Sequence, residues 1–106
     1  MKIPAGILRF MSSRLEFLHA NSDAIKAIAS RHKAFNVAVF GSVARGEDGP
    51  DSDIDFLVDF DKDVSVLDWL LLNEELEQFL NSRVDVVSTR GLKLRDTHIR
   101  EEAVLL

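Results

Sequence analysis

The stretch that decides the fold is residues 37–58, VAVFGSVARGEDGPDSDIDFLV. Two apolar runs, each with the length and composition of a buried strand, are joined there by a polar loop that contains glycine and proline. Side chains alternate between the two faces of a strand, so Asp53 and Asp55 are expected to project on one face. Ile54 and Phe56 are then expected on the opposite face, in a hydrophobic core.

Acidic side chains and a Gly-Ser pair lie at the two ends of this loop. Asp53 and Asp55 would repel each other, and raise each other's pKa, unless a positive charge lay between them. A hard divalent cation such as Mg²⁺, which prefers oxygen ligands, is the usual partner. Gly41 and Ser42 offer backbone N–H groups and a hydroxyl to an anion, most simply a phosphate. The pattern therefore predicts a nucleotide site.

Two common loop motifs do not fit this stretch. Gly41 and Gly46 have the spacing of a P-loop, but Glu47 and Asp48 stand where lysine and serine or threonine are required. An EF-hand is a poor match, because Phe56 occupies the loop position that requires glycine. A Gly-Ser pair, ten residues, an Asp-x-Asp pair and a more distant aspartate form a pattern far more specific than its parts.

Length, composition and charge bound the class of protein. The 106 residues suffice for one domain with a modest core, and a hydrophobic fraction of 46% indicates a soluble globular protein. No apolar run approaches the about 20 residues needed to span a bilayer, and cysteine is absent, so the cytoplasm is the expected location. The net charge of −5 disfavours nucleic acid as the main partner.

Hydrophobic periodicity predicts an α/β (α+β) domain, a small mixed β-sheet flanked by helices. The expected helices cover residues 3–19, 22–32, 65–80 and 94–105, with a helical turn at 43–46. The expected strands cover residues 35–40, 54–60 and 84–88. On the helix at 65–80, the side chains expected to be buried are Val66, Leu67, Leu70, Leu71, Leu76, Phe79 and Leu80. Asp85 interrupts the last strand, where a buried carboxylate is costly unless it is paired or binds a metal.

The spacing Gly41-Ser42-x10-Asp53-x-Asp55 resembles the signature of the DNA polymerase beta-like nucleotidyltransferase superfamily. The small size of the chain, together with RVDVV at residues 83–87 and IREEAV at residues 99–104, resembles the minimal nucleotidyltransferases, the MNT-type antitoxins of toxin–antitoxin pairs. The resemblance covers about residues 21–106, which are expected to form the nucleotidyltransferase domain. Residues 1–20 are expected to add an N-terminal amphipathic helix.

The resemblance implies a role for each matching position. Gly41 and Ser42 would hold the nucleotide triphosphate, most simply that of ATP. Asp53 and Asp55 would bind metal, with two Mg²⁺ ions expected, and Asp85 would be the third catalytic and metal-binding carboxylate, which helps to activate the acceptor hydroxyl. The expected reaction transfers AMP from ATP to a hydroxyl of a partner protein, a HEPN-type ribonuclease toxin.

Arg45 has two interpretations that the sequence leaves open. As the basic residue nearest to the Gly-Ser pair it could bind a phosphate of the nucleotide. It could equally be a surface arginine paired with Glu47 or Asp48, an arrangement that is common and weak.

Two other functions compete with protein adenylylation. A binding module would neutralise its partner by covering it, with a vestigial nucleotidyltransferase site, although the intact set of aspartates argues against decay. Transfer of a nucleotide to a small molecule, as in the aminoglycoside-modifying relatives, is disfavoured, because those enzymes usually need a further domain to bind the drug.

Overall fold

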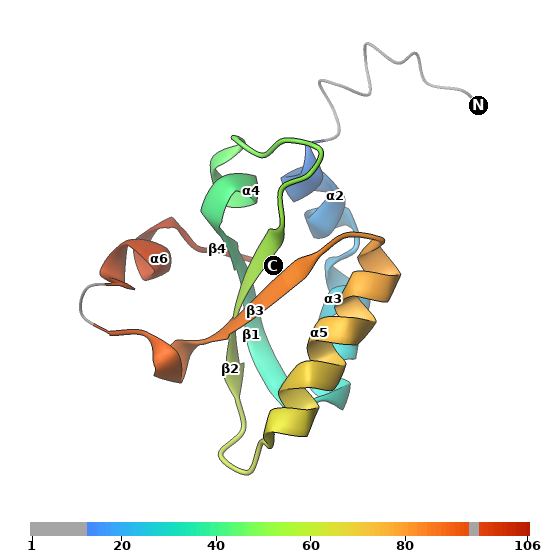
Figure 1. Ribbon diagram of the computed structural model, residues 1–106, viewed down its shortest axis with the longest axis vertical. Coiled ribbons are helices and arrows are strands. Elements are labelled where there is room, and N and C mark those ends of the chain that lie inside the picture. Colours follow the sequence, from blue (N-terminus) through green and yellow to red (C-terminus); the bar gives the residue numbers. More distant parts are fainter. Residues whose placement is uncertain (1–12, 94–95) are drawn as a thin grey trace.

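The computed structural model describes residues 13–93 and 96–106. Its centre is a four-stranded mixed sheet with the spatial order β3-β2-β1-β4 (Figure 1). The strands are β1 (Ala34–Phe40), β2 (Ile54–Phe60), β3 (Val84–Ser88) and β4 (Val104–Leu105). β1 pairs antiparallel with both β2 and β4, whereas β2 pairs parallel with β3. The three strands expected from the sequence are therefore confirmed, and the sheet gains a fourth.

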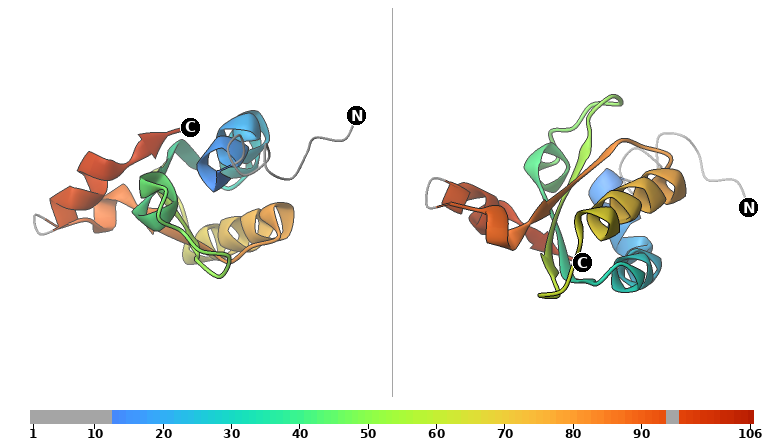
Figure 2. Two further views of the ribbon diagram at one scale, coloured as in Figure 1. Left: turned by 90° about the horizontal axis from the view of Figure 1, so that it is seen from above. Right: turned by 60° about the horizontal axis from the view of Figure 1, so that its bottom comes forward.

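Helices pack on both sides of this sheet. The helical segments are α2 (Arg14–Ala20), α3 (Ser22–Arg31), α4 (Gly41–Arg45), α5 (Val66–Leu80), the 3-10 turn η1 (Thr89–Gly91) and α6 (Thr97–Glu102). α3 and α5 cover one face, and α6 lies on the other side of the sheet from α5 (Figure 2). No helix within residues 13–93 and 96–106 is long and apolar enough to cross a membrane.

Strand β2 supplies the centre of the main core. Ile54, Phe56 and Val58 are at most 2% exposed, and they pack with α3 and α5 on one face of the sheet. The alternation predicted for this strand is confirmed. Leu57 points to the opposite face, where it joins a smaller apolar cluster with Ala38. The second face is thus only partly apolar, which leaves room there for charged side chains.

The predicted N-terminal helix lies partly within the described residues. Its residues 3–12 lie outside the described residues, and its remainder forms α2, which begins after the capping residue Ser13. The side chain of Ser13 accepts a hydrogen bond from the N–H of Glu16, as expected of an N-cap. Leu18 is fully buried in the main core, so this short helix packs against the domain.

The side chains predicted to be buried on α5 are largely wrong. The helix buries Leu72, Leu76 and Leu80 instead, of which only the last two were predicted. The other predicted positions are between 41% and 70% exposed: Val66, Leu67, Leu70, Leu71 and Phe79. Since α5 is apolar on more than one side, its periodicity does not determine which side faces the sheet.

The edge of the sheet determines how α5 faces it. The N–H groups of Val84 and Val86 donate to Glu77 Oε2 at 3.0 Å and to Asn73 Oδ1 at 3.1 Å. Trp69 Nε1 donates to the carbonyl of Val86 at 2.8 Å. These side chains of α5 satisfy backbone groups that an edge strand otherwise leaves unpaired. The helix must therefore turn its polar side toward β3, which leaves part of its apolar surface in solvent.

The last predicted helix, at residues 94–105, is also wrong at its C-terminal end. Helix α6 ends at Glu102, and Ala103 is already extended, with φ −64° and ψ 133°. Val104 and Leu105 then form β4 and pair with β1. The backbone of β1 needs hydrogen-bond partners on this side, and an additional strand supplies them where a longer helix would not.

Candidate active site

The strand register brings two of the predicted site residues side by side. Asp55 lies opposite Phe40 of β1 and opposite Asp85 of β3. The side chains of both aspartates therefore project on the face that α3 and α5 leave uncovered. Asp53 precedes β2 by one residue, at the end of the loop that follows α4. All three predicted carboxylates thus belong to one end of the sheet.

The expectation that Asp85 lies in a buried strand is wrong. β3 is an edge strand, and Asp85 is exposed on it while its neighbours Val84 and Val86 are buried. Alternation along the strand explains the pattern, because the two valines face α5 and the aspartate faces the open side. No burial cost therefore requires a partner for this carboxylate, and it is accessible to a ligand or to an acceptor group.

Asp55 lies where burial and neighbouring negative charges disfavour its ionised form. Partial burial raises the pKa of its carboxyl, and the negative charges of Asp85 and Asp53 raise it further, while Arg45 acts in the opposite direction. This mutual repulsion indicates that the carboxylates of Asp53, Asp55 and Asp85 lie close enough together to act on one another. The ligand set there consists of carboxylate oxygens, which is the donor chemistry that Mg²⁺ prefers.

Asp53 is engaged elsewhere in this structure. Its Oδ1 lies 3.0 Å from Nε of Arg83, the residue that precedes β3. Within residues 13–93 and 96–106 no three acidic, histidine or cysteine side chains are placed so as to hold one ion. Mg²⁺ in nucleotide sites is commonly held by one or two carboxylates together with phosphate oxygens, so the aspartates fit such an ion in their chemistry.

Position 41 requires glycine, because its backbone conformation and its closeness to Asp55 leave no room for a side chain. The residue has φ +74°, a backbone conformation that L-amino acids with a side chain rarely adopt. A Cβ atom placed on it would lie 2.3 Å from Oδ2 of Asp55, which is closer than non-bonded atoms approach. The two ends of the Gly41-Ser42-x10-Asp53-x-Asp55 spacing therefore meet in space, and the absence of a side chain at Gly41 allows this approach.

The Gly-Ser pair opens α4, and its glycine is hydrogen-bonded to a residue that the sequence pattern does not mark as part of the site. The backbone N–H of Gly41 donates to Oε1 of Glu102 at 3.0 Å, across 61 positions of sequence. Ser42 follows as the second residue of α4 and is partly exposed. Spacing in the sequence gives no signal for Glu102, because its contact depends on where α6 packs.

Arg45 is paired with two carboxylates. Its Nη1 donates to Oε2 of Glu102 at 2.9 Å and its Nε donates to Oε2 of Glu47 at 3.1 Å. These hydrogen bonds, that of Glu102 first, raise the pKa of the guanidinium. Of the two partners considered from the sequence, Glu47 is thus confirmed, whereas Asp48 lies 3.6 Å from Nη1 of Arg14.

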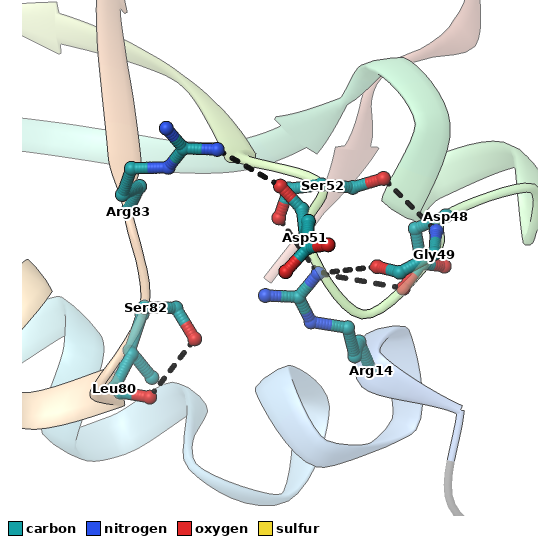
Figure 3. A network of polar contacts seen from close by, with 8 residues as sticks. All are labelled: Arg14, Asp48, Gly49, Asp51, Ser52, Leu80, Ser82 and Arg83. Carbon is teal, nitrogen blue, oxygen red and sulfur yellow. Dashed lines mark hydrogen bonds and ion pairs between the residues drawn. The ribbon is translucent and has the colours of Figure 1, made fainter.

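The loop that leads to Asp53 is held by arginines from two directions (Figure 3). Nη1 of Arg14, on α2, donates to the carbonyl of Ser52 at 2.8 Å and to that of Gly49 at 3.4 Å. Nη2 of Arg83 donates to the carbonyl of Asp51 at 3.1 Å. Neither arginine is marked as part of the site by the sequence pattern. Their contacts tie the loop to α2 and to the start of β3, and so position the chain just before Asp53.

Known proteins are similar to this chain in sequence and in fold. The family model described as a nucleotidyltransferase domain matches residues 22–104. Protein adenylyltransferase MntA of Thermococcus cleftensis is 42% identical over 78 residues, which are 72% of this chain and 79% of that protein.

Solved structures agree with the sequence comparison. A protein described as a candidate minimal nucleotidyltransferase superposes with a TM-score of 0.78 and 46% identity, covering 87% of this chain and 95% of that one. The MNT antitoxin complex with the tri-AMPylated HEPN toxin of Shewanella oneidensis gives a TM-score of 0.62 at 20% identity, covering 82% and 69% of the two chains. The second likeness is one of fold alone.

Proposed function

Since this chain belongs to the nucleotidyltransferase domain family, as a minimal, DNA polymerase beta-like enzyme of that family, we propose that it transfers AMP from ATP to a hydroxyl group of a partner protein. The observation that carries the proposal is the contact between Gly41 and Asp55, with no space for a Cβ atom between them. It sets the proposed phosphate-binding turn directly against the proposed metal-binding carboxylate.

In this proposal the turn and its neighbours bind the triphosphate. The N–H of Gly41 and the hydroxyl of Ser42 donate hydrogen bonds to phosphate oxygens, and the guanidinium of Arg45 supplies positive charge. Phosphoryl transfer depends mainly on positioning and on charge stabilisation, so fixed donors of this kind suffice for the protein's part. The close packing of Gly41 on Asp55 keeps the phosphates next to the carboxylates.

The three aspartates form the other half of the proposed site. Asp53, Asp55 and Asp85 would hold the Mg²⁺ ions, for which two sites are proposed. Asp85, which lies opposite Asp55 in the strand register, would also face the acceptor. The ions, when bound, neutralise the triphosphate and make the acceptor hydroxyl more acidic. Asp85 accepts the proton as the hydroxyl oxygen attacks the α-phosphorus, and the bond from that phosphorus to pyrophosphate breaks. Its exposure on an edge strand leaves it open to an acceptor from another chain.

The proposed acceptor is a HEPN-type ribonuclease toxin, which this chain would silence as its antitoxin. Two similarities support it: a relative named protein adenylyltransferase, and an MNT antitoxin of the same fold in complex with an AMPylated HEPN toxin. The reaction consumes ATP, so we place it in the cytoplasm. A nucleic acid is not proposed as the main partner, because the chain carries a net charge of −5.

A purely binding role is the second candidate. It is favoured by the apolar side chains that α5 exposes, among them Val66 at 70% and Leu67 at 62%, since such surfaces often contact other proteins. A module of this kind would silence its partner without transferring a nucleotide.

One experiment separates the two functions. The genetically adjacent protein is incubated with this chain, Mg²⁺ and ATP, and its intact mass is measured. We expect a gain of one or more AMP units that disappears with Asp53→Ala and persists with Asp51→Asn, which removes a neighbouring exposed carboxylate. A stable complex that silences the partner with no gain of mass would instead establish the binding role.

A further inference from the structure

The carboxylate of Glu102 occupies two of the three groups that the proposed function assigns to the nucleotide, the N–H of Gly41 and the guanidinium of Arg45. Its Oε1 accepts the backbone N–H of Gly41 at 3.0 Å, and its Oε2 accepts Nη1 of Arg45 at 2.9 Å. A carboxylate that bridges a backbone N–H and a guanidinium uses the geometry by which phosphate oxygens are recognised. Glu102 therefore stands in the place of a phosphate group.

The charge state of Glu102 is consistent with this role. Burial acts to raise the pKa of its carboxyl, but the hydrogen bonds from Arg45 and from Gly41 outweigh burial and lower the pKa overall. The side chain is 22% exposed, and it is ionised at neutral pH. Its neighbour Glu101, in the same turn of α6, is exposed. A full negative charge thus sits on the proposed triphosphate-binding turn.

A triphosphate and this carboxylate cannot use the same donors. The N–H of Gly41 makes one hydrogen bond at a time, and two anions within a few ångströms repel each other strongly at low dielectric. We propose that Glu102 is a built-in competitor of the nucleotide, a phosphate mimic that must leave Gly41 and Arg45 before the triphosphate binds. This inference rests on the proposed function, since it takes Gly41 and Arg45 as the nucleotide-binding groups.

The position of Glu102 in the chain gives its displacement a structural consequence. It is the last residue of α6, and the next residues lead into β4, which pairs with β1 at Val39–Val104 and Ala38–Leu105. When Glu102 leaves the turn, α6 loses both of these contacts with α4. Nucleotide binding is thereby coupled to the loss of the two hydrogen bonds by which Glu102 ties the end of α6 to α4.

The test uses paired single-charge variants of the whole chain. Binding of the non-hydrolysable analogue AMP-PNP with Mg²⁺ is measured by calorimetry for the wild type, Glu102→Gln and Glu101→Gln. The first variant keeps the shape of the side chain and removes its charge, and the second removes an equal charge one residue away. We expect Glu102→Gln to bind about fivefold to tenfold more tightly, the range expected when a partly exposed charge-assisted contact no longer competes. Glu101→Gln should change the affinity less than about twofold.

A second measurement does not depend on a variant. In the wild type, the NMR signals of the backbone amide of Gly41 and of the Nη1–H of Arg45, which both donate to Glu102, should shift on addition of AMP-PNP. Amide hydrogen exchange should become faster within residues 97–102. An unchanged α6 in a protein that binds the analogue would overturn the inference, as would equal or weaker binding by Glu102→Gln. If none of the three proteins, Glu102→Gln included, binds AMP-PNP, the proposed function itself fails, and the inference fails with it.

Discussion

The two faces of the sheet differ in composition: one is apolar and buried, and the other carries carboxylates. Strand β2 contributes side chains to both faces. On the face covered by α3 and α5, Phe56 and its neighbours are buried in the main core. On the opposite face the same strand presents Asp55 and Asp59, with Leu57 between them in a smaller apolar cluster. One face stabilises the fold and the other carries the charges, because a strand alternates its side chains.

The two faces also differ in how far the fold destabilises charged side chains. Among the described residues, no polar or charged side chain is buried in the covered face or elsewhere. On the open face, burial and the neighbouring carboxylates of Asp85 and Asp53 raise the pKa of Asp55, so its ionised form is destabilised by the fold. A site that concentrates negative charge is stabilised by a cation rather than by its own packing. Variants of the two faces should therefore separate activity from stability.

The largest effect is expected for Asp55→Asn on the open face. Transfer should fall about a thousandfold or more, since the proposed function makes this carboxylate a metal ligand, and such a ligand contributes several kcal/mol to the transition state. The melting temperature should not fall, and should rise by at most about 2 °C, because removing the charge relieves repulsion at a half-exposed site. Transfer is measured by intact mass of the acceptor, and folding by calorimetric melting.

Asp51→Asn is the matched control for Asp55→Asn. The substitution removes the exposed carboxylate of Asp51 from the loop before Asp53. The backbone carbonyl of Asp51, which accepts the hydrogen bond from Arg83, is kept. Transfer should stay within about twofold of the wild type, as expected for an exposed charge that makes no direct contact. Equal losses in the two variants would mean that general negative potential, rather than Asp55 itself, supports the reaction.

On the covered face the largest effect is on stability. Leu76 is 1% exposed, whereas Leu70 of the same helix is 53% exposed. Leu76→Ala should lower the free energy of unfolding by about 3 kcal/mol, the cost of a lost buried side chain and a cavity. Leu70→Ala should change it by less than about 0.5 kcal/mol. Denaturant unfolding measures both, and similar losses would mean that α5 does not face the sheet as described.

A smaller effect is expected where α2 meets the loop before Asp53. Arg14→Ala removes the hydrogen bonds to the carbonyls of Ser52 and Gly49, which hold that loop. Transfer should fall about fivefold, equivalent to about 1 kcal/mol of lost positioning. The control is Lys26→Ala on the exposed side of α3. Unchanged transfer by the Arg14 variant would show that the loop positions Asp53 without help from α2.

The smallest effect concerns the pH dependence of stability at Asp59. Hydrogen bonds from Thr89 and then from Asn36 lower the pKa of this carboxyl. A carboxyl whose pKa is lower in the folded chain stabilises the fold above its unfolded pKa, and this stability is lost as pH falls through the folded value. Asp59→Asn should therefore cost about 1 kcal/mol at pH 7, and this cost should shrink progressively as the pH falls below the ordinary pKa of an aspartate.

The comparison for this variant is Asp61→Asn, in the exposed turn after β2. Unfolding free energies are measured from pH 7 to pH 3 for the wild type and both variants. A constant difference between Asp59→Asn and the wild type across that range would show that packing, and not ionisation, accounts for the loss.

The local sequence determined much of the site. The alternation from Asp53 to Val58 assigned Ile54 and Phe56 to the core and Asp55 to the other face, and the burial of β2 agrees. The Gly-Ser pair marked the turn that Asp55 contacts, because a strand followed by a turn needs small residues at the point of close approach. These features depend on neighbours a few residues apart, which is the range over which backbone geometry dictates where side chains point.

Only the tertiary structure decided which distant groups complete that site. Glu102 reaches Gly41 across 61 positions, and Arg14 and Arg83 converge on one loop from α2 and from β3. Local pattern also left the orientation of α5 undetermined, since apolar residues occupy several of its sides and the edge of β3 selected among them. Such contacts depend on how whole helices and strands pack against one another. That packing must both pair the backbone groups of the sheet edges and bury apolar surface, and the residue pattern within one segment does not show which arrangement achieves this.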